Sequence, residues 1–236
     1  MKKIIYSLTV LCLTFSVLSC TKENAESKFK RILMFNEEKY EYNSNGKISE
    51  YIGNDYTETY TYSGNTITKI FDSHSGLTPY TCVYKLNPSG YVSTSTTNYE
   101  DPRYPLSTSS YEYDSSGHLI KWTTSWGTSS MYTTYEYING NLITEKDFNI
   151  KDMQSIEAGS ARYEYYLDKE NTLSNEYFGK GFLGKSSKNL LKKITGSNGD
   201  TVTYTYEYDK DNFVRNMTEA PSFGNTYSYP LVWDWI

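Results

Sequence analysis

One short motif returns along almost the whole chain: an alternating segment such as Tyr-Glu-Tyr that runs into a turn containing glycine or asparagine. The fullest copy, YEYDSSGHLIKW, covers residues 111–122, and weaker copies reach their turns near residues 46, 64, 90, 140, 171 and 212. Alternation with a period of two before such a turn is typical of a β-hairpin. The regular return of the motif therefore predicts an all-β chain assembled from similar hairpins.

The turns themselves predict how the strands pair. The segment Asp114-Ser-Ser-Gly117 suits a type I turn followed by a left-handed residue, and Asn139-Gly140 suits a two-residue loop. Counting outward from each turn places a large apolar residue opposite an aliphatic one. The predicted pairs are Tyr42 with Ile48, Tyr62 with Ile67, Leu86 with Val92, Tyr113 with Leu119, Tyr137 with Leu142, Leu167 with Leu173, and Tyr208 with Val214. Directly opposed residues share a face of the sheet, so this face is predicted to be the interior.

The other face is predicted to be wet, because it carries the glutamates of the repeat and a series of threonines. These residues are Glu41, Glu112, Glu136, Glu164, Glu207, Thr57, Thr59, Thr61, Thr203 and Thr205. Farther from the turns, strict alternation also makes the tyrosine face polar, at Glu50, Lys69, Lys121, Thr144 and Asn175. Neither face then offers a continuous apolar band. The chain resembles an outer-membrane barrel in its layout but is expected to lack a lipid-facing belt.

The spacing of the repeats predicts about 14–16 strands in one antiparallel up-and-down meander over residues 29–236. Such a meander either closes, or nearly closes, into a barrel, or it stays an open, strongly curved single sheet. One rim is predicted to be short and uniform. The other is predicted to hold the variable connections, near 73–79, 98–106, 126–130, 148–160 and 179–188. Variable loops on a rigid scaffold usually carry function, so any binding site is expected there.

The N-terminus is predicted to be a processing signal. Lys2 and Lys3 precede an apolar stretch that ends in Val-Leu-Ser and Cys20, which resembles the lipobox of bacterial lipoproteins. Residues 1–19 are then the signal peptide, Cys20 is the lipidation site and residues 20–28 are a tether. Each buried methylene of an acyl chain contributes about 0.8 kcal/mol to membrane binding. The expected location is the cell envelope, as an outer-membrane lipoprotein that is periplasmic or surface-exposed. An ordinary secretory signal is the alternative.

Composition excludes other classes of protein. The mean hydropathy is −0.66 and 26 residues are tyrosine, so tyrosine must supply much of the buried surface of a protein without apolar membrane helices. Removal of residues 1–19 takes two lysines from the 23 basic residues, which leaves 21 against 28 acidic residues and a net charge of −7. That balance argues against nucleic acid as a partner. Cys82 would be the one cysteine left after lipidation, and its place in an alternating segment predicts a small core residue.

The Tyr-Asp-x-x-Gly rhythm resembles the tyrosine–aspartate repeats of Rhs-type proteins. The lipoprotein signal followed by degenerate copies over residues 29–236 is similar to a family of uncharacterised lipoproteins of Gram-negative anaerobes, described as a domain of unknown function with a porin-like fold. The resemblance implies a meandering β-barrel and implies no activity. The chain departs from the pattern at Leu86, at the longer turn 168–171 and at the insertion 179–188.

No catalytic residue, metal site or cofactor is predicted. The two histidines, His74 and His118, cannot supply a zinc site of several histidines, and His118 is expected to be exposed. Asp114, Asp209 and Asp211 are expected to cap their own turns. A pair of carboxylates could still serve a hydrolase, which stays as a third possibility for the function.

The tryptophans are the candidate ligand-binding residues. Trp122 and Trp126 flank a connection of the variable rim, where an indole can stack on a sugar or a peptide side chain. The alternative is that Trp126 packs in the barrel. Trp233 and Trp235 in the tail either act as similar platforms or close the barrel. The favoured function is a lipid-anchored, non-catalytic binding or scaffold role toward a glycan or peptide. The alternative is a structural or assembly partner of another envelope protein.

Overall fold

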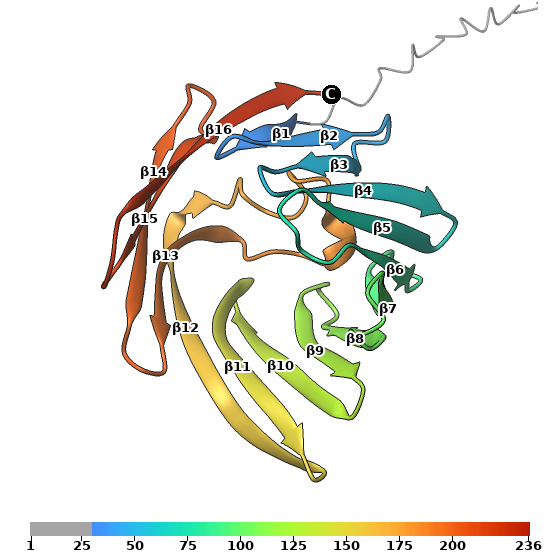
Figure 1. The fold of residues 1–236 in the computed structure, drawn as a ribbon. Helices are drawn as coiled ribbons and strands as arrows, with labels where there is room; N and C mark the ends of the chain where they lie inside the picture. Colours follow the sequence, from blue (N-terminus) through green and yellow to red (C-terminus); the bar gives the residue numbers. More distant parts are fainter. Residues whose placement is uncertain (1–29) are drawn as a thin grey trace, which may run out of the picture.

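The computed structural model describes residues 30–236, which form a closed barrel of sixteen antiparallel strands (Figure 1). Every strand is hydrogen-bonded to its neighbours in the sequence, and the first strand pairs with the last. The predicted all-β up-and-down barrel is confirmed, and the open-sheet alternative is wrong. The signal peptide, Cys20 and the tether lie outside the described residues.

The strands are β1 (Lys30–Phe35), β2 (Glu38–Tyr42), β3 (Ile48–Ile52), β4 (Tyr56–Ser63), β5 (Thr66–Ser73), β6 (Tyr80–Leu86), β7 (Val92–Tyr99), β8 (Ser107–Tyr113), β9 (Leu119–Trp126), β10 (Ser129–Ile138), β11 (Asn141–Lys151), β12 (Gln154–Glu170), β13 (Asn189–Gly196), β14 (Thr201–Tyr208), β15 (Val214–Pro221) and β16 (Tyr227–Trp235). A single short 3₁₀ helix, η1 (Gly181–Leu183), is the other regular element of the described chain. Within residues 30–236, no helix has the length and apolar character needed to cross a membrane.

The aromatic tail closes the barrel. Strand β16 pairs with β1, so that Trp233 lies opposite Ile32 and Leu231 lies opposite Phe35. Closure removes the free strand edges that an open sheet would present. The interpretation that the tail tryptophans complete the barrel is therefore confirmed for the strand that carries them.

Because the chain runs back and forth, alternate connections gather at opposite ends of the barrel. We call one the turn end; it holds connections 43–47, 64–65, 87–91, 114–118, 139–140, 171–188 and 209–213. We call the other the loop end; it holds connections 36–37, 53–55, 74–79, 100–106, 127–128, 152–153, 197–200 and 222–226. Strand β1 begins and strand β16 finishes at the turn end.

Four connections of the turn end share one hydrogen-bonded design. The side-chain oxygen of the first residue accepts from the backbone N–H groups two and four residues later, at 2.9–3.1 Å. These first residues are Asn43, Asn87, Asp114 and Asp209. Gly117 and Asn212 occupy the left-handed position, with φ of 93° and 63°. The predicted turn chemistry is confirmed, and Asp114 and Asp209 cap their turns as expected.

Six of the seven predicted cross-strand pairs are confirmed by the register of the hairpins. The pair of Leu167 with Leu173 is wrong. Strand β12 pairs with β13 instead, with Tyr165 opposite Leu191. Residues 171–188 intervene between the two strands, and Leu167 is left exposed.

The prediction that the tyrosine face turns polar is wrong in most hairpins, because of β-bulges. The register shifts by one residue just after the turn in the hairpins of β3, β7, β9, β11 and β15, and each shift reverses the alternation of faces. Tyr51 and Trp122 therefore lie opposite inward-facing tyrosines, whereas Glu50 and Lys121 lie opposite outward-facing glutamates. The hairpin of β4 and β5 has no bulge, so Lys69 faces the interior opposite Tyr60, as predicted.

The outer wall is polar on both strands of most hairpins, as the repeat predicts. Glu112 faces Lys121, Glu136 faces Thr144, Thr61 faces Thr68 and Lys85 faces Thr94.

Two connections predicted for the loop end are wrong. The segment 148–160 is a continuation of strands β11 and β12 that turns at Asp152 and Met153, and the segment 179–188 lies at the turn end.

Candidate functional site

Residues 171–188, the insert, fold into the barrel interior at the turn end and carry η1 (Figure 1). The backbone of the insert is bonded to the turns around it. The N–H of Ile48 donates to the Gly179 carbonyl at 3.2 Å, and the N–H groups of Lys185 and Lys188 donate to carbonyls of the turns after β8 and β10 at 2.8 Å each. These bonds come from three separate hairpins, so the insert is fixed to the wall rather than laid loosely against it.

Two glycines of the insert let its backbone approach the wall. A Cβ on Gly179 would lie 2.6 Å from the Ile48 nitrogen, and a Cβ on Gly184 would lie 2.6 Å from the Tyr113 ring. Both glycines have positive φ, of 65° and 94°, a conformation that other residues adopt only under strain. The insert therefore depends on glycine at these places for conformation and for space.

Phe182 anchors the insert in the core. Its ring lies 6.0–6.5 Å from the rings of Tyr60, Tyr62 and Tyr84, all of which face inward. The buried cluster around it contains Ile32, Tyr40, Ile48, Tyr51, Ile67, Val92, Leu190, Val214 and Leu231. The interior at this end is thus a packed core built jointly by the strands and the insert.

A charged group lies where the insert meets β4 and β5. Lys69 Nζ is 2.7 Å from Glu58 Oε1, the Tyr60 hydroxyl donates to Glu58 Oε2, and Lys69 also donates to the Tyr80 hydroxyl at 3.0 Å. Lys180 Nζ of the insert lies 4.0 Å from Glu58 Oε2. The same ammonium lies 5.7–6.0 Å from the ring centroids of three tyrosines, Tyr40, Tyr51 and Tyr60, a range in which cation–π attraction acts.

The pKa values of this group follow from burial and pairing. Burial would raise the pKa of Glu58, but Lys69, the Tyr60 hydroxyl and Lys180 outweigh burial and hold that pKa below its usual range. Burial lowers the pKa of Lys180 despite the attraction of Glu58. Burial also opposes the charge of Lys69, yet Glu58 raises its pKa overall. The Glu58 carboxylate therefore forms ion pairs with two lysines, Lys69 and Lys180.

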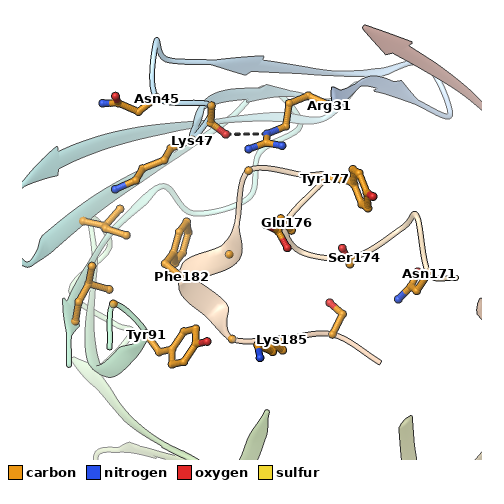
Figure 2. A pocket seen from close by; sticks show the side chains of 18 of the residues that line it. Arg31, Asn45, Lys47, Tyr91, Asn171, Ser174, Glu176, Tyr177, Phe182 and Lys185 are labelled. Carbon is orange, nitrogen blue, oxygen red and sulfur yellow. Dashed lines mark hydrogen bonds between the residues drawn. The ribbon is translucent and has the colours of Figure 1, made fainter. Parts of the chain in front are cut away.

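A cavity of about 630 Å³ lies between the insert and the surrounding turns. Figure 2 shows side chains that line it. Arg31, Lys47, Glu176 and Lys185 are among the side chains that line it. Arg31 Nε donates to the Gly46 carbonyl at 2.8 Å, and burial lowers the arginine pKa. The lining carries four basic residues, Arg31, Lys47, Lys185 and Lys188, against two acidic residues, Glu170 and Glu176, so its net charge is +2.

A smaller cavity of about 220 Å³ lies at the loop end. Tyr99, Tyr104, Pro105, Ser107 and Trp126 line it. Trp126 and Tyr104 are 37% and 51% exposed, so both rings offer surface to solvent. Exposed aromatic rings beside a hydroxyl can stack on an apolar ligand face while the hydroxyl fixes its orientation.

The structure separates the two predicted ligand-binding tryptophans. Trp126 ends β9 at the loop end and joins the 100–106 connection in the cavity. Trp122 lies four residues deeper on the same strand, opposite Tyr111 and Thr133, and does not line that cavity. Trp122 therefore belongs to the wall of the barrel rather than to the rim.

The tail tryptophans lie at the turn end. Trp233 packs against Phe213 and Tyr177 at ring distances of 5.0 and 5.6 Å, and its Nε1 donates to the Val214 carbonyl at 2.6 Å. Trp235 is 59% exposed. The contacts of Trp233 agree with a role in barrel closure.

The histidines and Cys82 make local contacts. His118 is buried, which makes the prediction of an exposed side chain wrong, because its ring stacks on Tyr137 at 4.5 Å and its Nδ1 lies 3.2 Å from Asp114 Oδ2. His74 lies 3.0 Å from the Thr57 hydroxyl. Cys82 is buried, as predicted for a small core residue. The described residues hold no group of three or more potential metal ligands.

No family model matches the chain, and no curated protein matches it in sequence. Among solved structures, it is similar to a porin-like protein from Bacteroides uniformis, with a TM-score of 0.60 and 16% identity over 84% of this chain and 90% of the other. A porin-like protein from Bacteroides vulgatus gives a TM-score of 0.58 and 14% identity over 86% and 98%. At these identities the likeness shows the fold alone, and the predicted porin-like fold is confirmed.

Proposed function

We propose that the chain is a lipid-anchored, non-catalytic binding protein of the cell envelope that binds its ligand at the loop end. The observation that carries the proposal is the cavity with the exposed rings of Trp126 and Tyr104. It lies at the end of the barrel opposite the one where the described chain begins.

The position of the first described residue supports an orientation in which the turn end faces the membrane and the loop end faces away from it. Strand β1 begins with Lys30 at the turn end, ten residues after Cys20. A fully extended chain of that length reaches about 35 Å. An acyl anchor on Cys20 thus holds the turn end near the membrane and leaves the loop end available to ligands.

The walls and the insert favour binding over transport. The outward-facing pairs are polar on most hairpins, which suits a barrel that stands in water. The insert packs into the turn end through Phe182 and four backbone hydrogen bonds to the strands and turns around it. A barrel whose turn end is partly occupied by its own insert is suited to holding a ligand at the loop end.

The proposed ligand is a glycan or a peptide. Both present flat or apolar faces that an indole can cover, for about 1 kcal/mol beyond the burial itself. The second candidate, an assembly role with another envelope protein, is favoured by apolar side chains at the tips of the loop end, of which Met153 is 99% exposed.

Glycan and peptide arrays probed with the purified protein test the binding role. Trp126→Ala should weaken the strongest array signal at least about tenfold, a loss equivalent to about 1.4 kcal/mol. Trp235→Ala is the matched control, because it removes an exposed indole from the other end. Equal signals for the wild type and Trp126→Ala, or a ligand lost only in Trp235→Ala, would overturn the proposal.

The anchor has its own test. Cys20→Ala should move the protein from the membrane fraction to the soluble fraction of the envelope, because the acyl chains are then absent. Membrane association that survives this substitution would contradict lipidation at Cys20. It would not affect the binding role, which the arrays test separately.

A further inference from the structure

The loop end exposes most of the large apolar side chains that reach solvent in the described chain. Eight of the fifteen lie there, on five of its connections or beside them: Leu77, Tyr104, Leu106, Trp126, Met153, Ile156, Phe223 and Tyr227. Solvent-exposed apolar groups gathered on one face of a protein usually mark an interaction surface.

The same end carries a strong negative charge. Its connections contain six acidic residues, Glu37, Asp55, Glu100, Asp101, Asp152 and Asp200, against one basic residue, Arg103, for a net charge of −5. The connections of the turn end contain five lysines and four acidic residues, for a net charge of +1. The negative charge of the connections is therefore concentrated at the end that also exposes apolar side chains.

The charge narrows the choice of partner. A second copy of the chain docked end to end would bring two sets of connections of net charge −5 together, and like charges across an interface oppose association. An anionic membrane surface would repel the loop end in the same way. A positively charged polypeptide would be attracted to the carboxylates, and its lysines and arginines could also lie over exposed rings such as Tyr104 and Trp126.

We infer that the loop end docks a polypeptide segment that combines basic and apolar side chains. The inference rests on the proposed function for the place of the site and adds the chemical class of the partner. The carboxylates supply attraction at a distance and select against acidic partners. The apolar side chains supply the contact area, and the segment would lie across the tips of the connections rather than inside the barrel.

Fluorescence anisotropy with two synthetic peptides tests the inference. One peptide has three repeats of Lys-Leu-Lys-Tyr, and the other has glutamate in place of each lysine. The lysine peptide should bind the purified full chain in detergent, with an affinity that falls as salt rises from low to high concentration because exposed charges are screened. The glutamate peptide should bind at least about tenfold more weakly.

Two sets of variants with the same change in net charge locate the site. Glu37→Gln, Asp55→Asn, Glu100→Gln and Asp152→Asn together should weaken the lysine peptide about tenfold, because all four carboxylates are exposed at the loop end. The control set Glu41→Gln, Glu112→Gln, Glu136→Gln and Glu207→Gln changes the exposed outer wall and should leave binding within about twofold.

Equal weakening by both sets, equal binding of both peptides, or no binding of the lysine peptide would overturn the inference. The proposed function has a separate readout. If Trp126→Ala abolishes array binding to a neutral glycan while the peptides do not bind, the binding role stands and the cationic partner is wrong.

Discussion

The turn end and the loop end are built from the same sixteen strands. They differ in whether the side chains of their connections contact the protein itself or are left in solvent. At the turn end, four matching turns cap themselves and the insert packs inside them. At the loop end, connections of two to seven residues leave aromatic and acidic side chains in solvent. The difference teaches that the turns of the repeat form a rim, the turn end, whose side chains bond within the protein. The side chains of the loop end stay available to other molecules, as is usual for loops on a rigid scaffold.

The largest expected effect is at the insert. Gly179→Ala places a Cβ 2.6 Å from a backbone nitrogen at a φ of 65°, which should lower the free energy of unfolding by about 3 kcal/mol. Gly181→Ala is the control in the same segment, because an added Cβ there meets nothing within 4 Å. Urea unfolding of both variants measures the difference. A loss below about 1 kcal/mol for Gly179→Ala would mean that the insert is not held as the structure describes.

The next effect concerns the ion pairs that join the insert to the wall. Glu58→Gln keeps the shape of the side chain but leaves Lys69 and Lys180 without their carboxylate, which should lower the free energy of unfolding at neutral pH by about 2 kcal/mol. Lys121→Gln is the control, because that lysine pairs on the outer wall at 3.8 Å with a half-exposed glutamate, where ion pairs contribute at most about 1 kcal/mol.

The pH dependence of Glu58 gives a second check on the same variant. The pKa of Glu58 in the folded protein lies below its ordinary value, so its stabilising contribution is present above an unfolded pKa of about 4.3 and is lost as pH falls through the folded pKa. The stability difference between the wild type and Glu58→Gln should therefore shrink in acid. A difference that stays constant down to pH 3 would show that the carboxylate charge is not what stabilises the insert.

The hairpins could be predicted from sequence because their signals are local. Turn residues and the first pair beside each turn lie within about ten residues of one another, so Tyr113 opposite Leu119 follows from counting. The bulges could not be predicted by counting. A bulge adds one residue to one strand of the hairpin, and no residue type in the strand marks the position of that extra residue. Strict alternation consequently predicts that Lys121 faces the interior. In the structure the neighbouring Trp122 faces the interior instead, opposite Tyr111.

The insert was assigned to the wrong end although the sequence carried a usable signal. In all other copies of the repeat, the alternating segment before the turn runs toward the turn end, and Tyr163-Glu-Tyr165 does the same. The residues after it must therefore leave from the turn end. The contacts of Lys180 and Phe182 with β4 and β6 could not be found so simply, because they join residues about a hundred positions apart.

A smaller effect compares one glycine from each end. Gly117 and Gly76 have similar φ, of 93° and 85°, but a Cβ on Gly117 would meet the Tyr91 side chain at 2.5 Å, and one on Gly76 would meet nothing within 4 Å. Gly117→Val should lower the free energy of unfolding by about 2 kcal/mol and Gly76→Val by about 1 kcal/mol, the cost of backbone strain alone. Thermal unfolding of both variants measures the gap. Equal losses would show that Tyr91 moves aside and that the turn end is less tightly packed than the structure indicates.

The last comparison concerns one tryptophan from each end. The Trp126 side chain lies at the loop end and is 37% exposed, so most of the indole is buried, and Trp126→Ala should lower the free energy of unfolding by about 2 kcal/mol. Trp233→Ala is the same substitution at the turn end, where the indole packs on Phe213 and Tyr177 and donates to the Val214 carbonyl; it should cost about 3 kcal/mol. Urea unfolding at one pH compares the two directly. If Trp126→Ala costs as much as Trp233→Ala, Trp126 is a packing residue, and the division between a closed end and a binding end fails where it matters most for function.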